Sequence, residues 1–535
     1  MNAVIAPEEA LPARRSQTSP RGSRNVPQQW GGLLRNRTSE WHDRVALAVL
    51  GTAAAVLSVW NLNTAPAYRD DEGTYTAQVF SVYEGTLAPY TYGYEDPPLG
   101  WMQLGALAWL PNVLGLGDGT YIGATRYAIA PFFVATALLV YLVARRLGVR
   151  VPFAALAVAF FVLSPLSLVF GRQVYLDNVG MPWLLLGFWM ALSPRTALWH
   201  HIGAGVFFAV AVLSNETLVL FGPALVVALL NRPAWANRVF SVVGFVVVGG
   251  IAIIFYPLMA LLRGELLTGP GHVSLQDALV YQFVTRSGSG SLWEAGSDRA
   301  ELVNGWLYYD QFFIAAGLTA GLLCLLQRGT VWIPVAVASF VAPVAIGAGY
   351  LPPMFIIGVL PFLALAIGVG FDTLWSWWKA YTPTLGTKER AWTNGYAVAC
   401  AVLGVVVVSS LQWFGPGRAQ LTQEANAEWA TALAWVQDNV PEDDTILVPY
   451  VMWQDLSSHG REDPWTVVPT EKADLDPEFL SEHPEGAAAI DWVVVGPNTD
   501  ETIESLGLTI AGQALDNSET VQTIGSWSVH RVQRE

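Results

Sequence analysis

The chain has 535 residues, of which 53% are hydrophobic and only 13% are charged, whereas a soluble domain carries about 25% charged residues. This composition excludes an ordinary soluble enzyme, and the apolar content excludes a largely disordered chain. Both cysteines lie inside apolar runs, which excludes a disulfide scaffold and a cysteine zinc site. The sequence contains neither an H-E-x-x-H pattern nor a glycine-rich phosphate- or dinucleotide-binding motif.

Charge is distributed unevenly along the chain. The net charge is −15, and residues 415–535 contain 22 acidic against five basic residues, so the first 414 residues sum to +2. The sequence therefore predicts a near-neutral apolar body followed by an acidic, water-soluble domain. A nucleic-acid partner is not expected, because neutralising phosphates requires a basic surface.

The first 42 residues are polar and rich in Pro, Ser, Gly and Arg, which predicts a disordered tail. Apolar runs then dominate the segment 43–414, and we interpret eleven of them as transmembrane helices. The runs lie at about 45–66, 121–143, 151–170, 178–193, 201–214, 217–230, 239–262, 310–326, 331–349, 353–370 and 392–413.

Basic residues predict the orientation of these spans. With eleven alternating spans, the N-terminus and the basic loops fall in the cytoplasm. The basic loops hold Arg145-Arg146, Arg195, Arg232 with Arg238, Arg328, and Lys379 with Lys388 and Arg390. A further apolar run at 99–116 would reverse this arrangement if it crossed the membrane, so we expect it to lie in the outer interface. The dominance of Arg over Lys, with abundant Ala and Val, suggests a bacterial cytoplasmic membrane protein.

Three segments are predicted to lie outside the membrane: a first loop at 67–120, a loop at 263–308, and the domain 415–535. Within the last of these we predict a helix at 424–440 that Pro441 ends. Apolar runs at 446–452 and 490–495 predict buried strands, and 521–532 predicts a further strand or hairpin. The result is a small extracytoplasmic α/β domain.

Acidic residues crowd the first external loop. Asp70, Asp71 and Glu72 follow the first span directly, and Glu95 and Asp96 precede a proline pair. Carboxylates at a lipid boundary are costly unless they are hydrated, paired or used. One of them could take the proton of an acceptor hydroxyl that attacks a lipid-linked sugar. The alternative is a solvated cap of the helix expected at 74–83.

Three other polar sites fall on the same predicted face. Arg172 and Asp177 occupy one external turn, Arg126 stands near the external end of a span, and Glu216 follows Asn215 in another turn. Arginine can hold a phosphate bidentately. The alternatives are a salt bridge within the turn, an arginine that reaches lipid headgroups, and helix capping. Their occurrence on a single face favours a common site.

In chain order these residues resemble the GT-C membrane glycosyltransferases of family 39, the protein O-mannosyltransferase-like (lipid A aminoarabinose transferase-like) group. That pattern has Asp-Glu after the first span, a charged residue before Pro-Pro-Leu and an aromatic, an Arg opening the next span, an Arg…Asp turn and a late Pro-rich span. The matching residues are Asp71-Glu72, Asp96-Pro97-Pro98-Leu99 with Trp101, Arg126, Arg172 with Asp177, and Tyr350-Leu351-Pro352-Pro353 with Pro361. The resemblance covers about residues 45–370.

The resemblance implies an α-helical polytopic GT-C fold and an inverting transfer of a hexosyl or pentosyl unit from a polyprenyl-phosphate donor. The acceptor would be a hydroxyl of a glycan, lipid or protein at the outer membrane face. Asp71 would be the general base, with Asp70 as its alternative if the register differs by one residue. The other implied site residues are Glu72 to orient the base or acceptor, Arg126 and Arg172 for the donor phosphate, and Asp177, Glu95, Asp96, Tyr75 and Glu216 for substrate binding.

The chain departs from relatives that carry Lys or His before the proline pair, because it has Glu95-Asp96 there. This leaves the phosphate to arginine and leaves open a Mg²⁺ or Mn²⁺ ion among Asp71, Glu95 and Asp96, since these ions prefer oxygen ligands. No metal ligand is assigned, and no other cofactor is expected.

Two other functions compete with glycosyl transfer. A transporter or flippase for a lipid-linked sugar would carry ionisable residues near the membrane midplane, whereas here they crowd one interface. A non-catalytic anchor for the acidic domain is the third possibility. That domain has no catalytic pattern, and we expect it to guide acceptor binding. Six of its tryptophans could stack on sugars or pack a core: Trp429, Trp435, Trp453, Trp465, Trp492 and Trp527.

Overall fold

Each of the eleven apolar runs contains helix, because a backbone in an apolar setting must satisfy its own hydrogen bonds. The computed structural model describes residues 37–194, 198–231, 235–347, 349–381, 387–461 and 463–533. The helices of the apolar body are α1 (Arg37–Val59), α4 (Tyr121–Arg146), α5 (Val151–Leu163), α6 (Pro165–Gly171), α7 (Leu176–Ala191), α8 (Leu198–Ser214), α9 (Gly222–Leu230), α10 (Trp235–Ile253), α11 (Phe255–Arg263), α13 (Asp298–Cys324), α14 (Trp332–Ile346), α15 (Leu360–Tyr381) and α16 (Thr387–Thr422).

Five stretches of helix in the described part of the chain are long and apolar enough to cross a membrane. A sixth is obtained if α5 and α6, which are bent by 62° at Ser164, count as one span. Three shorter apolar stretches, at Trp199–Ser214, Glu216–Leu230 and Trp332–Ile346, accompany them. The chain is thus a multi-pass helical protein, and the number of eleven spans stays a prediction.

The ends of two predicted segments differ from the structure. Helix α1 begins at Arg37, inside the predicted tail, whose residues 1–36 lie outside the described ranges. Helix α16 continues to Thr422, beyond the boundary predicted at 414. A side chain from the end of α1 meets the end of α16, where the indole Nε1 of Trp60 donates to the carbonyl of Leu421 at 3.2 Å.

Short helices build the loops at one end of the bundle. They are α2 (Asp70–Ser81), η1 (Val82–Glu84), α3 (Leu99–Val113), η2 (Glu216–Phe221), α12 (Leu275–Val280), η3 (Tyr281–Thr285) and η4 (Pro353–Gly358). The run at 99–116 forms α3, as predicted, and it presents Met102, Trp109, Leu110 and Val113 on its exposed face. That exposed apolar face fits a helix lying in a membrane interface, which stays a prediction.

The C-terminal segment folds as an α/β domain, as predicted. Its elements are α17 (Ala427–Asn439), β1 (Ile446–Val448), α18 (Tyr450–Ser457), η5 (Pro464–Thr466), β2 (Val467–Pro469), α19 (Lys472–Leu475), α20 (Pro477–Glu482), η6 (Gly486–Ala489), β3 (Trp492–Val495), α21 (Thr499–Leu506), α22 (Thr509–Asp516), β4 (Ser518–Ile524) and β5 (Trp527–Val532). The sheet order is β2-β1-β3-β5-β4. The first three strands are parallel, and β5 is antiparallel to both β3 and β4.

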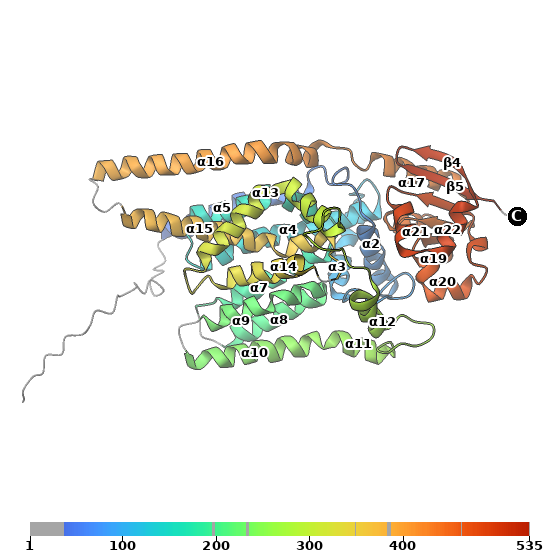
Figure 1. Ribbon diagram of the computed structural model, residues 1–535, viewed down its shortest axis with the longest axis horizontal. Helices are drawn as coiled ribbons and strands as arrows, with labels where there is room; N and C mark the ends of the chain where they lie inside the picture. The colour runs from blue at the N-terminus through green and yellow to red at the C-terminus, as the bar shows by residue number, and fades with distance from the viewer. Residues whose placement is uncertain are drawn as a thin grey trace, which may run out of the picture. The chain divides into compact units, whose positions relative to one another are not determined.

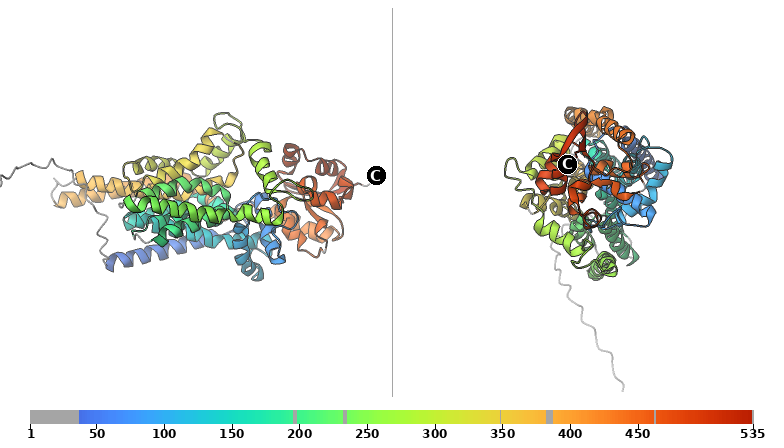
Figure 2. Two further views of the ribbon diagram at one scale, coloured as in Figure 1. Left: turned by 90° about the horizontal axis from the view of Figure 1, so that it is seen from below. Right: turned by 90° about the vertical axis from the view of Figure 1, so that its right-hand side faces the viewer.

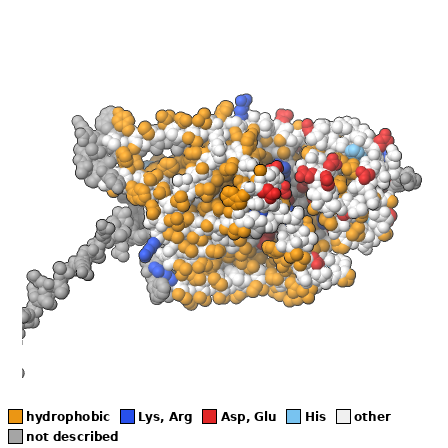
Figure 3. Space-filling view, in the orientation of Figure 1, with side chains coloured by type: hydrophobic (Ala, Val, Ile, Leu, Met, Phe, Trp, Pro, Cys, Tyr) orange, Lys and Arg blue, Asp and Glu red, His pale blue; other side chains and the backbone are white. Residues whose placement is uncertain are grey.

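One strand prediction was wrong. The run 446–452 is strand only to Val448, and the rest belongs to α18. Pro449 sits at the N-cap of that helix, because proline cannot donate to a sheet ladder and favours a helix start. Figures 1 and 2 show this sheet and its helices beyond the loop end of the bundle, next to α2. In Figure 3, hydrophobic side chains cover the visible face of the helices, and acidic ones gather towards this domain.

The C-terminal domain shares a hydrophobic core with the first external loop. Trp429, Trp453 and the inner faces of the strands pack with Tyr90 and Ile122 of the apolar body. Four of the six tryptophans singled out above are buried in the core, namely Trp429, Trp453, Trp492 and Trp527. Residues Val45–Glu535 accordingly form one compact unit.

Two contacts fix this packing close to the loop. A Cβ on Gly73 of α2 would lie 2.0 Å from the backbone oxygen of Tyr450, so the close approach of α2 to α18 requires glycine. The carboxylate of Asp455 on α18 accepts from the backbone N–H groups of Tyr121 at 2.6 Å and Ile122 at 3.4 Å. Asp455 thereby caps the start of α4 from another part of the chain.

Tyr90 is the loop residue most deeply engaged by the domain. Its ring stacks on Trp465 at 4.1 Å, and its hydroxyl contacts the carbonyls of Pro464 at 2.5 Å and Val467. We expect Tyr90→Ala to cost about 3–5 kcal/mol of folding free energy, because it leaves a cavity in a shared core. Tyr90→Phe, which keeps the ring, is expected to cost about 1 kcal/mol. Thermal unfolding and limited proteolysis around 423–426 measure both; equal effects would show that the ring is not the anchor.

Candidate functional site

The acidic run of the first loop forms the first turn of α2. Arg69 is extended at its N-cap, and Asp70, Asp71 and Glu72 follow in the first turn, where negative charge suits the positive end of a helix. The helix therefore begins four residues before the predicted start at Thr74. Successive helical residues are about 100° apart, so the three carboxylates point in different directions. Each consequently has its own surroundings.

Glu72 points into the protein and forms a buried ion pair with Arg126. Its Oε1 lies 2.6 Å from Nη2 of Arg126 and its Oε2 lies 2.8 Å from Nε, and both side chains are fully buried. Glu72 also accepts from the backbone N–H groups of Val174 at 2.9 Å and Arg69 at 3.2 Å. This carboxylate therefore ties α2 to α4 and to the turn that precedes α7.

The other donors of Arg126 go to backbone carbonyls. Nη1 donates to Leu62 at 3.1 Å and Pro66 at 2.8 Å, and Nη2 donates also to Ala67 at 3.3 Å. The guanidinium lies 4.2 Å from the centre of the Tyr68 ring. All five N–H donors of an arginine are thus engaged by the protein, which leaves none for a donor phosphate in this structure.

Arg172 is also buried, and it binds helix ends. Its Nη1 donates to the carbonyl of Gln420 in α16 at 3.1 Å, and its Nη2 donates to the carbonyl of Trp60 after α1. Its Nε is buried without a partner among the described residues. The ion pair between Arg172 and Asp177, considered above as an alternative for this turn, does not form. Arg172 holds carbonyl groups in this structure, and Arg126 holds Glu72 and three carbonyl groups that follow α1. Phosphate binding by either arginine stays a prediction.

Asp71 is exposed at the protein surface. We use the word recess for its immediate surroundings, which include Asp70, Glu95 and Arg286, the groups whose charges act on it. Burial by the surrounding protein, followed by the charge of Asp70, raises the pKa of Asp71 to about 6, while Arg286 opposes the shift. A side chain can be reached by water and still be poorly solvated when protein atoms displace most of the bulk solvent around it. Such a carboxylate is mostly ionised at neutral pH and remains a good proton acceptor.

Beside this recess, carboxyl groups from four segments meet around Tyr75 of α2. The Tyr75 hydroxyl donates to Oδ2 of Asp96 at 3.2 Å, and the carboxyl of Glu216 lies close enough to Asp96 for its charge to act on it. Asn215 donates to Oδ2 of Asp177 at 3.0 Å. Burial and then the charge of Glu216 raise the pKa of Asp96 well above its usual range, because two adjacent carboxylates cannot both ionise. The structure thus brings together Asp71, Tyr75, Asp96, Asp177 and Glu216, whose roles stay predictions.

The structure places a cation, Arg286, beside Asp71. No motif in the sequence predicted it. Arg286 follows η3 in the loop 263–308, and its guanidinium lies 3.5 Å from the centre of the Tyr350 ring. Its Nη1 donates to Gln282 at 3.1 Å. It stands close enough to Asp71 to lower the pKa of that carboxyl. Arg286 is only half-buried, so its remaining donors can face the recess.

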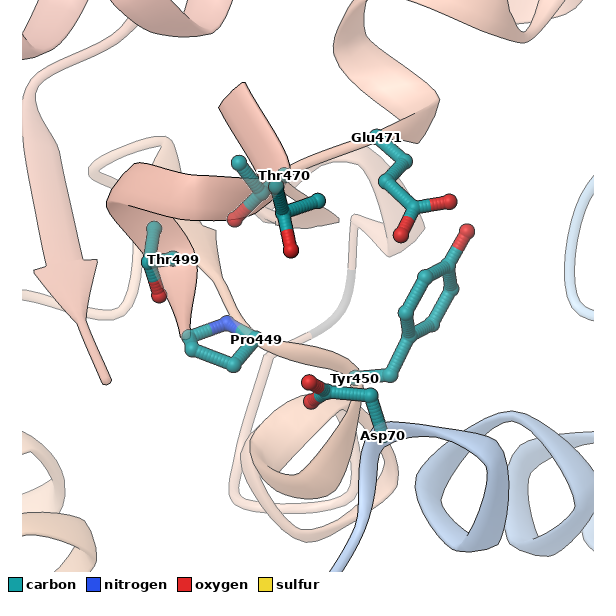
Figure 4. Close-up of a pocket in the computed structure, with 7 residues that line it drawn as sticks. Asp70, Pro449, Tyr450, Thr470, Glu471 and Thr499 are labelled. Atoms are coloured by element: carbon teal, nitrogen blue, oxygen red, sulfur yellow. The ribbon is translucent and has the colours of Figure 1, made fainter. Parts of the chain in front are cut away.

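The C-terminal domain contributes a carboxylate as well. Glu471 follows β2, and its pKa is raised to about 7 by burial and then by the charges of Glu95, Asp70 and Asp71. Figure 4 shows Asp70 and Glu471 at opposite sides of a small pocket, with the Tyr450 ring between them. Asp70 lines this pocket together with Pro449 and Tyr450, so it faces the domain, whereas Asp71 is not among the lining residues. Glu95 is exposed nearby.

Carboxylate oxygens are suitable ligands for Mg²⁺ or Mn²⁺. Across the ranges that the structure describes, however, no group of three or more His, Cys, Asp or Glu side chains is arranged to hold a metal ion. The ion that the sequence left open among Asp71, Glu95 and Asp96 therefore gains no support from these residues.

No protein-family model and no curated protein matches the sequence, whereas solved structures match the fold. ArnT from Cupriavidus metallidurans bound to undecaprenyl phosphate matches with a TM-score of 0.55 at 16% identity, covering 93% of this chain and 100% of that one. The Archaeoglobus fulgidus oligosaccharyltransferase AglB with an inhibitory peptide and a dolichol-phosphate matches with a TM-score of 0.53 at 12% identity, covering 93% and 75%. An oligosaccharyltransferase from Archaeoglobus fulgidus in complex with Zn and sulfate gives a TM-score of 0.54 at 13% identity, covering 88% of this chain and 71% of that one.

The chain therefore has the fold of the GT-C membrane glycosyltransferases, with a C-terminal α/β domain. This confirms the fold that the motif pattern predicted.

Proposed function

We propose that the chain is an inverting glycosyltransferase that moves a sugar from a polyprenyl-phosphate donor to a hydroxyl acceptor at the outer face of the cytoplasmic membrane. The observation that carries this proposal is the recess at the start of α2, where a partly desolvated carboxylate, Asp71, stands beside a half-buried cation, Arg286. The likeness of the fold to proteins bound to undecaprenyl phosphate and dolichol-phosphate supports a lipid-linked donor.

In this mechanism Asp71 takes the proton of the acceptor hydroxyl. The acceptor oxygen forms a bond to the anomeric carbon from one face while the bond from that carbon to the phosphate oxygen breaks on the other. Polyprenyl phosphate leaves with the electron pair. Asp96, Glu216 and Asp177 offer hydrogen-bond partners to sugar hydroxyls, and Arg286 stabilises the negative charge that builds on the phosphate.

The position of α4 supports a site on the outer side. Asp455 caps its first residues, and Arg145-Arg146 end it. Twenty-six residues of helix span about 39 Å, which exceeds the roughly 30 Å of a bilayer core. The acidic site and the basic loop therefore lie at opposite ends of a membrane-length helix, and basic loops favour the cytoplasm.

Transfer and transport are separated by one experiment. The full chain in proteoliposomes receives a radiolabelled polyprenyl-phosphate sugar and a hydroxyl acceptor extract, and the label is followed both chemically and across the bilayer. We expect the label to become covalently linked to the acceptor, with release of polyprenyl phosphate. Movement of intact labelled lipid without transfer would instead establish the transporter or flippase.

Arg286 is expected to bind the donor phosphate in place of Arg126 and Arg172. Arg286→Gln should raise KM for the donor about tenfold or more, since a charge-assisted hydrogen bond is lost. Because Arg286 lowers the pKa of Asp71, the acidic limb of the pH–rate profile should also move to higher pH. Steady-state kinetics against pH test both effects. Arg263→Gln is the matched control, because Arg263 belongs to the same side of the membrane and pairs with Glu265 at 2.6 Å. Unchanged donor KM in Arg286→Gln would refute the assignment.

A further inference from the structure

A pocket opens where the parallel strands of the C-terminal domain end. Its lining comes from the loop after β1 (Pro449 and Tyr450), the loop after β2 (Thr470 and Glu471) and the start of α21 after β3, namely Thr499 and Thr502. Asp70 of α2 completes it from the apolar body. Figure 4 shows the hydroxyl and carboxylate oxygens of these side chains around one small space.

This position is the switch point of the sheet. The chain passes from β1 through α18 to β2 on one side of β1, and from β3 through α21 and α22 towards the opposite edge. Met452 and Leu456 of α18 belong to the core on one face of the sheet, whereas Ala511 and Ala514 of α22 belong to the core on the other. Open α/β sheets bind ligands in the crevice outside the carboxyl ends of the strands at such a point.

The lining is polar on most sides and carries an aromatic ring. The Thr499 hydroxyl accepts from the N–H of Gly496 at 2.8 Å, which leaves its proton for another acceptor. The Thr470 hydroxyl donates to the carbonyl of Val448 at 3.2 Å, which leaves lone pairs to accept. Carboxylates such as Asp70 and Glu471 can each accept from two neighbouring hydroxyls.

We propose that this pocket is part of the acceptor subsite and that the acceptor is a neutral glycan. The pocket, with a volume of about 20 Å³, admits one hydroxyl or hydroxymethyl group of a sugar to Glu471, Asp70 and the threonines, while the ring itself stays at the mouth against Tyr450. The inference rests on the proposed function. The charge of Asp70 acts on Asp71, and the charge of Asp71 acts on Glu471, so the pocket and the proposed base are neighbours that different parts of one glycan could reach. The C-terminal domain would then define the acceptor, and the apolar body the donor.

The chemistry of the pocket disfavours the other acceptor classes. Two carboxylates without a lining cation repel a phosphorylated or acidic acceptor. A peptide strand is usually held by main-chain pairing along a sheet edge, whereas this pocket lies at strand ends. A lipid tail needs an apolar groove, and six of the seven lining residues carry hydroxyl or carboxyl groups.

Direct binding tests the subsite without any donor. Saturation-transfer NMR on the full chain in nanodiscs uses mannotetraose, arabinotetraose and a serine-containing octapeptide as probes. We expect transfer to ring protons of at least one oligosaccharide and none to the peptide. Glu471→Gln and Thr502→Val should each weaken that binding about tenfold. Thr502→Val keeps the shape of the side chain, and the Thr502 hydroxyl makes no contact needed by the fold among the described hydrogen bonds. Asp500→Asn, on the exposed side of α21, is the matched control.

The outcomes separate this inference from the proposed function. Binding of the peptide instead, or of no probe, would overturn the glycan subsite. If the chain transfers sugar to a glycan and Glu471→Gln leaves the acceptor KM unchanged, the glycan subsite is also overturned. The proposed glycosyl transfer would still stand. If oligosaccharides bind and the variants weaken that binding, but the chain transfers no sugar, the subsite is supported and the proposed function is rejected. A rise in acceptor KM with donor KM unchanged is the expected kinetic result.

Discussion

Asp71→Asn is expected to reduce sugar transfer by about 10²–10⁴-fold, because a positioned general base contributes that much. The amide keeps the shape of the side chain and cannot take the proton of the acceptor hydroxyl. Donor KM should change little, since Arg286 and the Tyr75–Asp96 network are untouched. Initial rates with labelled donor measure the effect. The control is Glu84→Gln, an exposed acid of the same external loop, which should retain normal activity.

The pH dependence gives an independent test of the same residue. The base must be ionised, and the pKa of Asp71 is about 6, so kcat/KM should fall tenfold per pH unit below about 6 and level off above it. Removing a neighbouring negative charge by Asp70→Asn lowers that pKa, which moves the acidic limb to lower pH. Arg286→Gln moves it to higher pH. Limbs that stay in place in both variants would show that another group titrates.

Stability should respond in the opposite sense to activity. The pKa of Asp71 in the folded protein lies above its unfolded value of about 3.9, so ionising it opposes folding as the pH rises through about 4–6. Asp71→Asn should therefore melt at the same temperature as the native chain or slightly higher at pH 7.5. Loss of activity with a lowered melting temperature would indicate a structural role instead.

Some of this site could be predicted from the sequence because its signals are local. An acidic run directly after an apolar segment stands out in any composition plot, and so does Glu95-Asp96 before a proline pair. Alternation of apolar and basic segments placed these groups with Asp177 and Glu216 on one side. The fold class followed from the order of these motifs along the chain, which no single motif would have established.

Other parts depend on contacts between distant segments. Arg286 lies in a loop without a motif, and only folding brings it beside Asp71. Glu471 lies in another domain, next to a strand too short to show an alternating pattern. Arg126 was expected to bind phosphate because an arginine near the external end of a span can hold a phosphate bidentately, and because the resemblance gives it that role. Which of three consecutive acids it would pair with depends on the rotation of α2, which the sequence does not specify.

Breaking the pair between Glu72 and Arg126 is the second change with a large expected effect. Arg126→Met should cost about 3–5 kcal/mol of folding free energy, because it leaves Glu72 charged, buried and without its partner. Three backbone carbonyls, of Leu62, Pro66 and Ala67, also lose their donor. Arg126→Lys should be damaging too, since a lysine cannot reproduce the two parallel bonds to one carboxylate. Thermal unfolding in detergent and the yield of folded protein measure both.

The same experiment decides between the two roles considered for Arg126. If it holds structure, the variants melt earlier and the remaining folded protein keeps its donor KM. If it holds phosphate, they melt normally and donor KM rises. Arg150→Met is the matched control, because Arg150 forms an ion pair with Asp372 at 2.8 Å with 43% of its side chain exposed. An exposed pair contributes less than about 1 kcal/mol, so a much larger loss at Arg126 than at Arg150 would reflect burial of the pair. That burial is what fixes the direction of α2 and hence the side of the helix on which Asp71 meets the recess.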